Sequence, residues 1–278
     1  VGQGAVVVLD AATGAVRAMA GGRDFRSSPF NRATDARRQP GSVFKAFAYL
    51  AALERGASPG DPVSDAPLAL GRWSPSNGQW RTRGSLSLEE AFAHSVNTSA
   101  VRVMQEAGGY RAVADAAQRL GVRGRLPRDG TIVLGTGEAT LLDLTAAFAA
   151  MANGGRRVTP FGLARVEAAG RPATPPRPEP AQVIPAATAA EMRRLMVAVT
   201  RIGTGRGAAL PGVVTGGKTG TTQEHRDAWF VGFAELPSGT VAIGVWLGND
   251  DNTAMEDVRG GTLPARLFRE VLESVRGG

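Results

Sequence analysis

The segment from Ser42 to about Arg55 constrains the fold most, because its sequence, SVFKAFAYLAALER, has almost no polar face before the last two residues. A helix that is apolar all round is normally buried. Pro40-Gly41 precedes the segment and Gly56 follows it, which is typical of a helix with defined ends. We therefore expect a buried helix inside a core that a chain of 278 residues is long enough to build.

One charged residue interrupts the first turn of this helix. Lys45 follows Ser42 by three residues, so the two side chains share a helix face. Lys45 and Lys218 are the only lysines among 32 basic residues, and every other basic residue is arginine. Lysine loses its proton when it is desolvated or lies near another cation, whereas arginine stays protonated. A buried Lys45 is therefore a candidate base that activates the Ser42 hydroxyl. The alternative is that Ser42 caps the helix and Lys45 extends to solvent.

Composition excludes several kinds of site. The chain has no cysteine, which rules out disulfides and thiolate metal sites. His94 and His225 are the only histidines, which argues against a zinc site or a Ser-His-Asp triad. The net charge is +7, but the arginines are scattered and aromatic residues are few, so we expect a solvated basic surface and no nucleic-acid partner. An acidic partner or anionic lipid headgroups are the alternatives for this charge. We expect no metal and no cofactor. No apolar run approaches the length of a membrane span, and the first residues do not resemble a signal peptide.

The remaining patterns place strands at both ends of the chain and helices in the middle. We predict an N-terminal hairpin with Gly14 in its turn, strands over 216–222, 228–234 and 241–247, and helices that begin after Ser87, at Asn97, and over 110–120, 140–153, 186–201 and 263–276. Ser87 and Glu90 fit a capping box. Residues 57–84 are a predicted loop, and the proline-rich residues 167–185 are predicted to be an exposed loop or edge excursion. The fold class is therefore α/β of the α+β type, with one antiparallel sheet of about five strands from both termini and helices on its faces.

Two further short motifs carry polar groups. Ser95-Val96-Asn97 lies between two predicted helices, where serine and asparagine are also common as caps. Lys218-Thr219-Gly220 lies in the glycine-rich strand GGKTGTT, whose glycines would let a substrate approach the backbone. We expect Lys218, Thr219 and Thr221 to project from one face of this strand and bind a carboxylate. Residues 212–219 also match the phosphate-loop pattern G-x-x-x-x-G-K-[ST], but the sequence that follows predicts a loop and a strand where that motif needs a helix.

Together, S-x-x-K, S-x-N and K-T-G are the motif set of serine β-lactamases and penicillin-binding proteins. Over nearly its whole length the chain resembles the transpeptidase domain of bacterial class A, bifunctional penicillin-binding proteins, through RQPGSVFK, KTGTT and DAWFVG. The resemblance implies a penicillin-binding, serine β-lactamase-like fold over residues 1–278, with 167–185 as a proline-rich loop. It also implies a parent protein with a glycosyltransferase domain and a membrane anchor, both absent from this chain. The domain would then act at the periplasmic, extracytoplasmic face of the inner membrane, while the chain itself would be soluble.

The resemblance also implies a mechanism. A serine acyl-enzyme forms on the D-Ala-D-Ala end of a peptidoglycan stem peptide, and an amine of a neighbouring stem peptide resolves it into a cross-link. Stem peptides and the lipid-linked precursor are the implied partners, and β-lactams are the implied covalent inhibitors. The roles carried over are Ser42 as nucleophile, Lys45 as base, Ser95 as proton relay, Asn97 as holder of the acyl side-chain amide, Lys218 as electrostatic support, Thr219, Gly220 and Thr221 as substrate-binding residues, and the N–H groups of Ser42 and Thr221 as the oxyanion hole.

Three alternatives share this machinery. A serine β-lactamase needs a glutamate as deacylation base, usually in an E-x-x-L-N loop, and Glu138 in EATLL lacks the asparagine. We expect Glu138 to cap the following helix or to compensate its dipole instead. A D-Ala-D-Ala carboxypeptidase would use water in place of the acceptor amine. A penicillin-sensing domain would be acylated without turnover.

Overall fold

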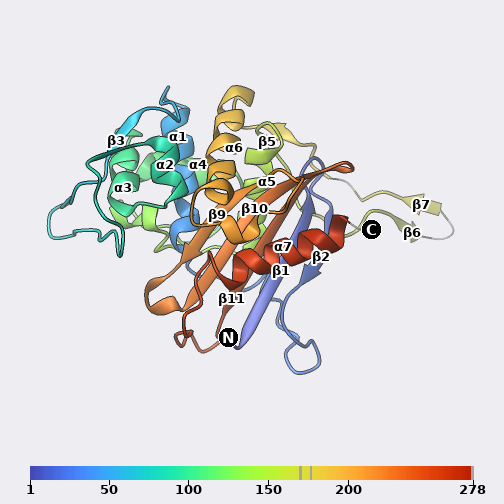
Figure 1. The fold of residues 1–278 in the computed structure, drawn as a ribbon. Helices are drawn as coiled ribbons and strands as arrows, with labels where there is room; N and C mark the ends of the chain where they lie inside the picture. The colour runs from blue at the N-terminus through green and yellow to red at the C-terminus, as the bar shows by residue number, and fades with distance from the viewer. Residues whose placement is uncertain (169–170, 176, 277–278) are drawn as a thin grey trace.

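A five-stranded antiparallel sheet forms the centre of the molecule, which is a computed structural model describing residues 1–168, 171–175 and 177–276. The strands run in the order β2-β1-β11-β10-β9 (Figure 1). They are β1 (Gln3–Asp10), β2 (Val16–Ala20), β9 (Thr215–Thr221), β10 (Asp227–Leu236) and β11 (Gly239–Gly248). The predicted sheet from both termini is confirmed. Strand β9 lies at one edge, so one side of its backbone is free of sheet partners.

Helices cover both faces of the sheet. Helices α5 (Leu141–Ala152) and α6 (Ala186–Arg201) pack on one face, and α7 (Leu263–Arg276) packs on the other. Neighbouring residues of β10 alternate between the two faces, because side chains of a strand point to opposite sides in turn. Phe230 packs with Phe268 of α7, whereas Val231 belongs to the core that contains α5 and α6. Because β9 pairs with β10, the same alternation determines which side chains of β9 point to the face covered by α5 and α6 and which point to the face covered by α7.

A group of helices lies to one side of the sheet, beyond β9 (Figure 1). It comprises the 3-10 segments η1 (Gly41–Phe44) and η2 (Gly130–Leu134) and the helices α1 (Lys45–Leu53), α2 (Leu88–Ala93), α3 (Asn97–Glu106) and α4 (Tyr110–Arg119). Every residue of α1 is buried, as the apolar pattern predicts. The first turn is a 3-10 turn, so the α-helix proper begins at Lys45 rather than at Ser42.

The segment 57–84, predicted as a loop, is held in place by short strands and a buried carboxylate. Strand β3 (Pro62–Ser64) pairs with β4 (Ser85–Ser87), directly before the predicted capping box of Ser87 and Glu90, which is confirmed. The Asp65 carboxylate accepts hydrogen bonds from Trp80 Nε1 and from the N–H groups of Arg83 and Gly84, each at 2.8 Å. The segment is therefore a fixed wall beside α3.

Two other segments differ in detail from the prediction. Residues 167–185 were expected to be an exposed loop or edge excursion, and the structure adds short strands there: β6 (Val166–Ala168) pairs with β7 (Arg171–Ala173), and β8 (Ala181–Gln182) pairs with β5 (Arg156–Arg157). Residues 169–170 and 176 of this stretch lie outside the described residues. The capping role considered for Glu138 is wrong, because Thr140 caps α5 by accepting from Asp143 N–H, and Glu138 is exposed before the cap. The remaining short elements are η3 (Arg206–Ala208) and η4 (Gln223–His225).

Candidate active site

Ser42 lies where the start of the buried helix meets the edge strand. Gly41 has φ 54° and its N–H donates to Gly135 O at 3.3 Å. A Cβ at Gly41 would lie 2.8 Å from Thr221 O, so only glycine allows this approach of η1 to β9. Ser42 is half-buried and borders a cavity of about 360 Å³. The wall of this catalytic cavity also includes Gln39, Trp73, Asn97, Thr131, Gly135, Thr136, Thr221, Thr222 and Gln223.

Lys45 is fully buried behind this wall, which confirms the burial expected from the sequence. Its Nζ lies 2.6 Å from Ser95 O, 2.5 Å from Asn97 Oδ1 and 3.1 Å from Ser95 Oγ. Burial, together with the charge of nearby Lys218, lowers the pKa of Lys45 well below its ordinary value. A neutral lysine donates two hydrogen bonds and keeps one lone pair, which matches two acceptors and one hydroxyl. Lys45 is therefore suited to accept a proton.

Ser95 and Asn97 hold strained and fixed positions at the junction of α2 and α3. Ser95 has φ 58°, a left-handed conformation that is uncommon for a residue with a side chain and that gathers at functional sites. Asn97 receives the bond from Lys45 on Oδ1 and donates from Nδ2 to Ser76 O at 2.5 Å. The Oδ1 and Nδ2 atoms of Asn97 therefore each have a hydrogen-bond partner, which fixes the orientation of the side chain at the cavity wall.

The second lysine reaches the same hydroxyl from the sheet. Lys218 Nζ donates to Ser95 Oγ at 2.8 Å and to Thr219 O at 3.2 Å, and it lies 5.6 Å from the centre of the Phe92 ring. Its side chain is fully buried, and this burial lowers the pKa of Lys218 to about 7. The Ser95 hydroxyl is therefore held between the two lysines of the chain.

The prediction that Lys218, Thr219 and Thr221 share one face of the strand is wrong. Cross-strand partners lie on the same face, and Lys218 is paired with Val231 on the face that packs against α5 and α6. Thr219 is paired with Phe230 on the α7 face, and its hydroxyl is 2.7 Å from that of Thr204. The physical reason is the two-residue period of a strand, which places odd and even positions on opposite sides.

The edge of β9 supplies backbone donors to the cavity. Thr222 N–H donates to Asp227 O in the ladder with β10, so the preceding pair, Thr221 and Ala228, is the non-hydrogen-bonded kind. The Thr221 N–H consequently points away from β10 toward the free edge. The Ser42 N–H donates to no backbone carbonyl among the described residues. These two N–H groups border one cavity and are available to a negatively charged oxygen.

Gly220 is required by packing within the protein. A Cβ at this position would lie 2.3 Å from Pro40 O and 2.8 Å from Val43 Cγ2. Strand β9 therefore rests directly on η1 here, and any side chain would separate the two. The sequence attributes this glycine to the approach of a substrate, whereas the contact shown is with the segment that carries Ser42.

The structure brings the three motifs together, but not with every expected contact. Among the described residues, Ser42 Oγ is not one of the hydrogen-bond partners of Lys45 Nζ, whose bonds all go to the second motif. The sequence also misses another part of the cavity wall, where Trp73 and Thr136 come from loops and Thr131 comes from η2, none of them with a recognisable motif. No pattern in those segments marks them as functional.

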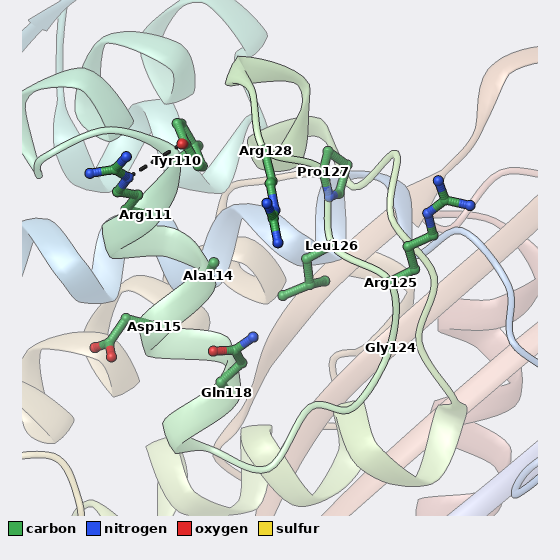
Figure 2. Close-up of a pocket in the computed structure, with 10 residues that line it drawn as sticks. All are labelled: Tyr110, Arg111, Ala114, Asp115, Gln118, Gly124, Arg125, Leu126, Pro127 and Arg128. Atoms are coloured by element: carbon green, nitrogen blue, oxygen red, sulfur yellow. Dashed lines mark hydrogen bonds between the residues drawn. The ribbon is translucent and has the colours of Figure 1, made fainter.

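A cavity larger than the one at Ser42 lies elsewhere. It has a volume of about 810 Å³ and separates α4 from the segment 124–128 (Figure 2). Arg111, Arg125 and Arg128 are exposed around it, and Figure 2 shows Arg111 turned toward Tyr110, whose hydroxyl accepts its hydrogen bond at 3.3 Å. None of the three motifs contributes to this cavity, so size alone does not locate the site.

Two further features were sought in the described part of the chain. It contains no cluster of three or more histidine, cysteine or acidic side chains that could hold a metal ion. Among the same residues, no helix is both long and apolar enough to cross a membrane.

The geometry defines a serine-nucleophile site of the acyl-transfer class, and comparisons with known proteins identify its family. A family model described as the penicillin binding protein transpeptidase domain matches residues 4–273. Penicillin-binding protein 1A of Neisseria meningitidis serogroup B is 41% identical over 96% of this chain and 35% of that protein. Penicillin-binding protein 1A of Aquifex aeolicus is 35% identical over 89% of this chain and 34% of that protein. The chain thus spans about a third of the length of these relatives.

Solved structures agree. The penicillin-binding protein PonA1 of Mycobacterium tuberculosis superposes with a TM-score of 0.88 at 30% identity, covering 100% of this chain and 79% of that one. The PonA1 structure in complex with penicillin V gives a TM-score of 0.85 at 29% identity, covering 100% and 80%. The chain therefore belongs to the family of penicillin-binding protein transpeptidase domains. Its enzyme class is that of the serine-type D,D-transpeptidases, and the resemblance indicated by the sequence motifs is confirmed.

Proposed function

We propose that this domain cross-links peptidoglycan stem peptides through an acyl-enzyme on Ser42. The observation that carries the proposal is the Ser95 hydroxyl, which both lysines of the chain contact beside the cavity of Ser42. Two buried lysines around one hydroxyl form a route for a proton. The cavity next to them supplies a nucleophile and backbone donors.

In the first step, the Ser42 hydroxyl attacks the carbonyl carbon between the last two D-alanines. Lys45 takes the hydroxyl proton while the Ser42 Oγ–carbon bond forms. The N–H groups of Ser42 and Thr221 bind the resulting oxyanion. The carbon–nitrogen bond then breaks, and the amine of the departing D-alanine receives its proton from Ser95. Lys45 returns a proton to Ser95, and the charges of the protein groups are restored.

The protonation states support these roles. Because burial and Lys218 lower the pKa of Lys45, its neutral form is more accessible than that of an ordinary lysine. Lys218 Nζ also donates to the Ser95 hydroxyl, and its positive charge stabilises negative charge that develops on the Ser95 oxygen when it gives up its proton. Two buried ammonium groups around one hydroxyl would repel each other. We therefore expect that Lys45 and Lys218 are not both fully protonated at the same time.

In the second step, an amine of another stem peptide attacks the acyl carbon and releases Ser42. Hydrolysis by water would need a further positioned base. Glu138, the carboxylate considered for a β-lactamase, is exposed and does not border the catalytic cavity. This supports a long-lived penicilloyl enzyme and argues against rapid β-lactam hydrolysis. β-Lactams are accordingly proposed to acylate Ser42 and remain bound.

The parent protein is proposed to carry more than this domain. The chain covers only about a third of its relatives, which supports a parent with a glycosyltransferase domain and a membrane anchor. The lipid-linked precursor would then be its partner, and the domain would act on the extracytoplasmic side of the inner membrane.

A cross-linking assay tests the proposal. The protein is given a thioester analogue of the stem-peptide end as donor and a D-amino acid as acceptor, and products are identified by mass spectrometry. The proposal predicts acceptor-containing product that disappears in Ser42→Ala. Hydrolysed donor alone would favour a carboxypeptidase, and rapid turnover of nitrocefin would favour a β-lactamase. An adduct without any product would favour a sensing domain.

A further inference from the structure

The cavity between α4 and the segment 124–128 is separate from the catalytic cavity. Their volumes are about 810 and about 360 Å³, and none of the described residues lines both. The segment 124–128 is held in place where Arg125 O accepts a hydrogen bond from Glu138 N–H at 3.2 Å, and it leads directly into η2, which forms part of the catalytic wall. A ligand in this cavity therefore lies near the catalytic site and leaves Ser42 accessible.

Three arginines around this cavity lack an acidic partner. Among the described residues, Arg111, Arg125 and Arg128 form no ion pair, and the one side-chain hydrogen bond of the set joins Arg111 to the Tyr110 hydroxyl at 3.3 Å. All three are exposed. Figure 2 shows Arg111 on the α4 side, Arg125 on the opposite side, and Arg128 directed into the space between them. This arrangement suits an extended ligand with several negative charges.

The nearby carboxylates do not neutralise these arginines. Among the described residues, Asp115 is the only acidic one that lines the cavity, and it accepts from Arg119 Nε at 2.9 Å. Figure 2 shows the Asp115 side chain turned away from the segment 124–128. The carboxylate of Asp129, next along the chain, accepts from the Thr131 N–H at 2.8 Å. The wall therefore carries an excess of positive charge that attracts an anionic ligand.

Between the arginines the cavity has an apolar surface. Ala114, Leu126 and Pro127 line it and are only partly buried, and Figure 2 shows Leu126 pointing toward α4. An apolar side chain placed there removes this surface from water, whereas a chain of bare phosphates has no group that does so. The half-buried Tyr110 also lines the cavity. Tyrosine and arginine are among the residue types enriched in protein–protein interfaces.

Two other occupants fit this cavity less well. None of the exposed large hydrophobic residues in the described part of the chain lies at it, so a membrane surface would meet charge here but no side chain that inserts into lipid. A second copy of the chain is also a poor match, because each copy has a net charge of +7 and the two would repel each other.

We propose that this cavity binds an acidic segment of a partner protein, in which aspartate or glutamate residues flank an apolar residue. Arg111, Arg128 and Arg125 bind successive carboxylates of the segment, and its apolar side chain packs on Leu126 and Ala114. Clusters of arginine are a recurring means of recognising acidic peptide motifs. Because the catalytic cavity takes no part, the partner binds the free and the acylated domain equally well.

The test titrates the protein into a fluorescently labelled peptide that has glutamates on both sides of one leucine, and binding is followed by anisotropy. A peptide with glutamine in place of glutamate should not bind measurably. A peptide with serine in place of the leucine should bind about fivefold more weakly, the effect expected from partial burial of one leucine. The affinity for the acidic peptide should fall as salt is raised from about 0.05 to about 0.5 M.

The cavity variant carries Arg111→Gln, Arg125→Gln and Arg128→Gln together. It should bind the acidic peptide about tenfold more weakly than the wild type, since each exposed ion pair contributes a few-fold at most. All three side chains are exposed, so the substitutions change charge without opening the core. Equal melting temperatures of the variant and the wild type check that the fold is retained.

The matched control variant carries Arg23→Gln, Arg26→Gln and Arg201→Gln, which removes the same charge from exposed positions outside the cavity. Its affinity should stay within about twofold of the wild type. Acylation of Ser42 by benzylpenicillin before the titration should leave the affinity unchanged, because the two cavities have no residue in common among those described.

Several results would overturn the proposal. They are the absence of saturable peptide binding to the wild type, equal binding by the cavity variant, an equal loss in the control variant, and equal binding of the serine peptide. Loss of binding after acylation would place the peptide in the catalytic cavity instead. Inorganic polyphosphate and vesicles of anionic phospholipid are titrated separately. If either binds as tightly as the peptide and depends on the same arginines, the assignment to a protein partner is wrong.

Discussion

Replacing Lys45 by arginine separates the role of a base from that of a positive charge. The substitution keeps a cation at the start of α1, but a guanidinium does not lose its proton in proteins. If Lys45 accepts the proton of Ser42, Lys45→Arg must be defective although its charge is retained. If Lys45 provides only electrostatic support, arginine should substitute for much of it.

The size of the effect follows from the surroundings of Nζ. Lys45 is fully buried, and its nitrogen lies 2.5 Å from Asn97 Oδ1 and 2.6 Å from Ser95 O. General-base catalysis contributes about 10²- to 10⁴-fold, or about 3–5 kcal/mol of transition-state stabilisation. The larger guanidinium also displaces these two acceptors. We therefore expect acylation to slow by about a thousandfold in Lys45→Arg.

The assay is the time course of acylation by a fluorescent penicillin, with thermal unfolding as the check that each protein is folded. Lys45→Met is the matched control, because it has a similar length and can neither accept a proton nor carry charge. The base assignment predicts that the arginine and methionine variants are similarly slow. Acylation of Lys45→Arg within tenfold of the wild-type rate would refute the assignment.

Three other perturbations test the packing around the site. Tyr49→Phe should leave stability unchanged or raise it by about 1 kcal/mol, because the buried Tyr49 hydroxyl has no partner among the described residues, and a lower melting temperature would contradict this. Gly220→Ala should cost about 2 kcal/mol and slow acylation, because its Cβ would lie 2.3 Å from Pro40 O, whereas Gly60→Ala has open space and should be silent in urea unfolding and penicillin labelling. Burial lowers the pKa of Lys218 to about 7. The unfolded chain therefore binds more protons than the native protein between pH 7 and about 10.4, and the unfolding free energy should rise with pH there by up to about 1.4 kcal/mol per unit. Burial also lowers the pKa of Lys45, so Lys45 contributes to the same rise. Urea unfolding of Lys218→Met at pH 7 and 9 should therefore show a smaller rise than the wild type, and an equal slope in both proteins would count against the lowered pKa of Lys218.

Much of the fold is predictable because its elements have strong local signals. The apolar run after Ser42, the capping box at Ser87 and the hairpin turn at Gly14 all form as their sequences indicate. The short strands β3, β6 and β7 are not predictable in the same way. Each has only three residues, which is too short for a recognisable alternation, and β3 and β7 each contain a proline, which normally argues against a strand.

The sequence predicts which residues form the site better than it predicts the hydrogen bonds between them. The scarcity of lysine points to Lys45 and Lys218, and both are buried around Ser95. The sequence assigns Lys45 to Ser42 because the two are three residues apart. The network of Lys45 with Ser95 and Asn97 instead depends on the left-handed turn at Ser95, which is a tertiary feature without a sequence pattern. Contacts across elements are set by packing, and a single sequence does not encode them locally.

The central claim, that Ser42 forms the acyl-enzyme, is tested most directly by a peptide map of the penicillin adduct. Trypsin cleaves after Arg38 and Lys45, and the peptide between them, QPGSVFK, has Ser42 as its only hydroxyl residue. The account predicts that this peptide gains the mass of one intact penicillin and that Ser42→Ala abolishes the gain. An adduct on any other peptide, or none after prolonged incubation of the folded protein, would contradict it.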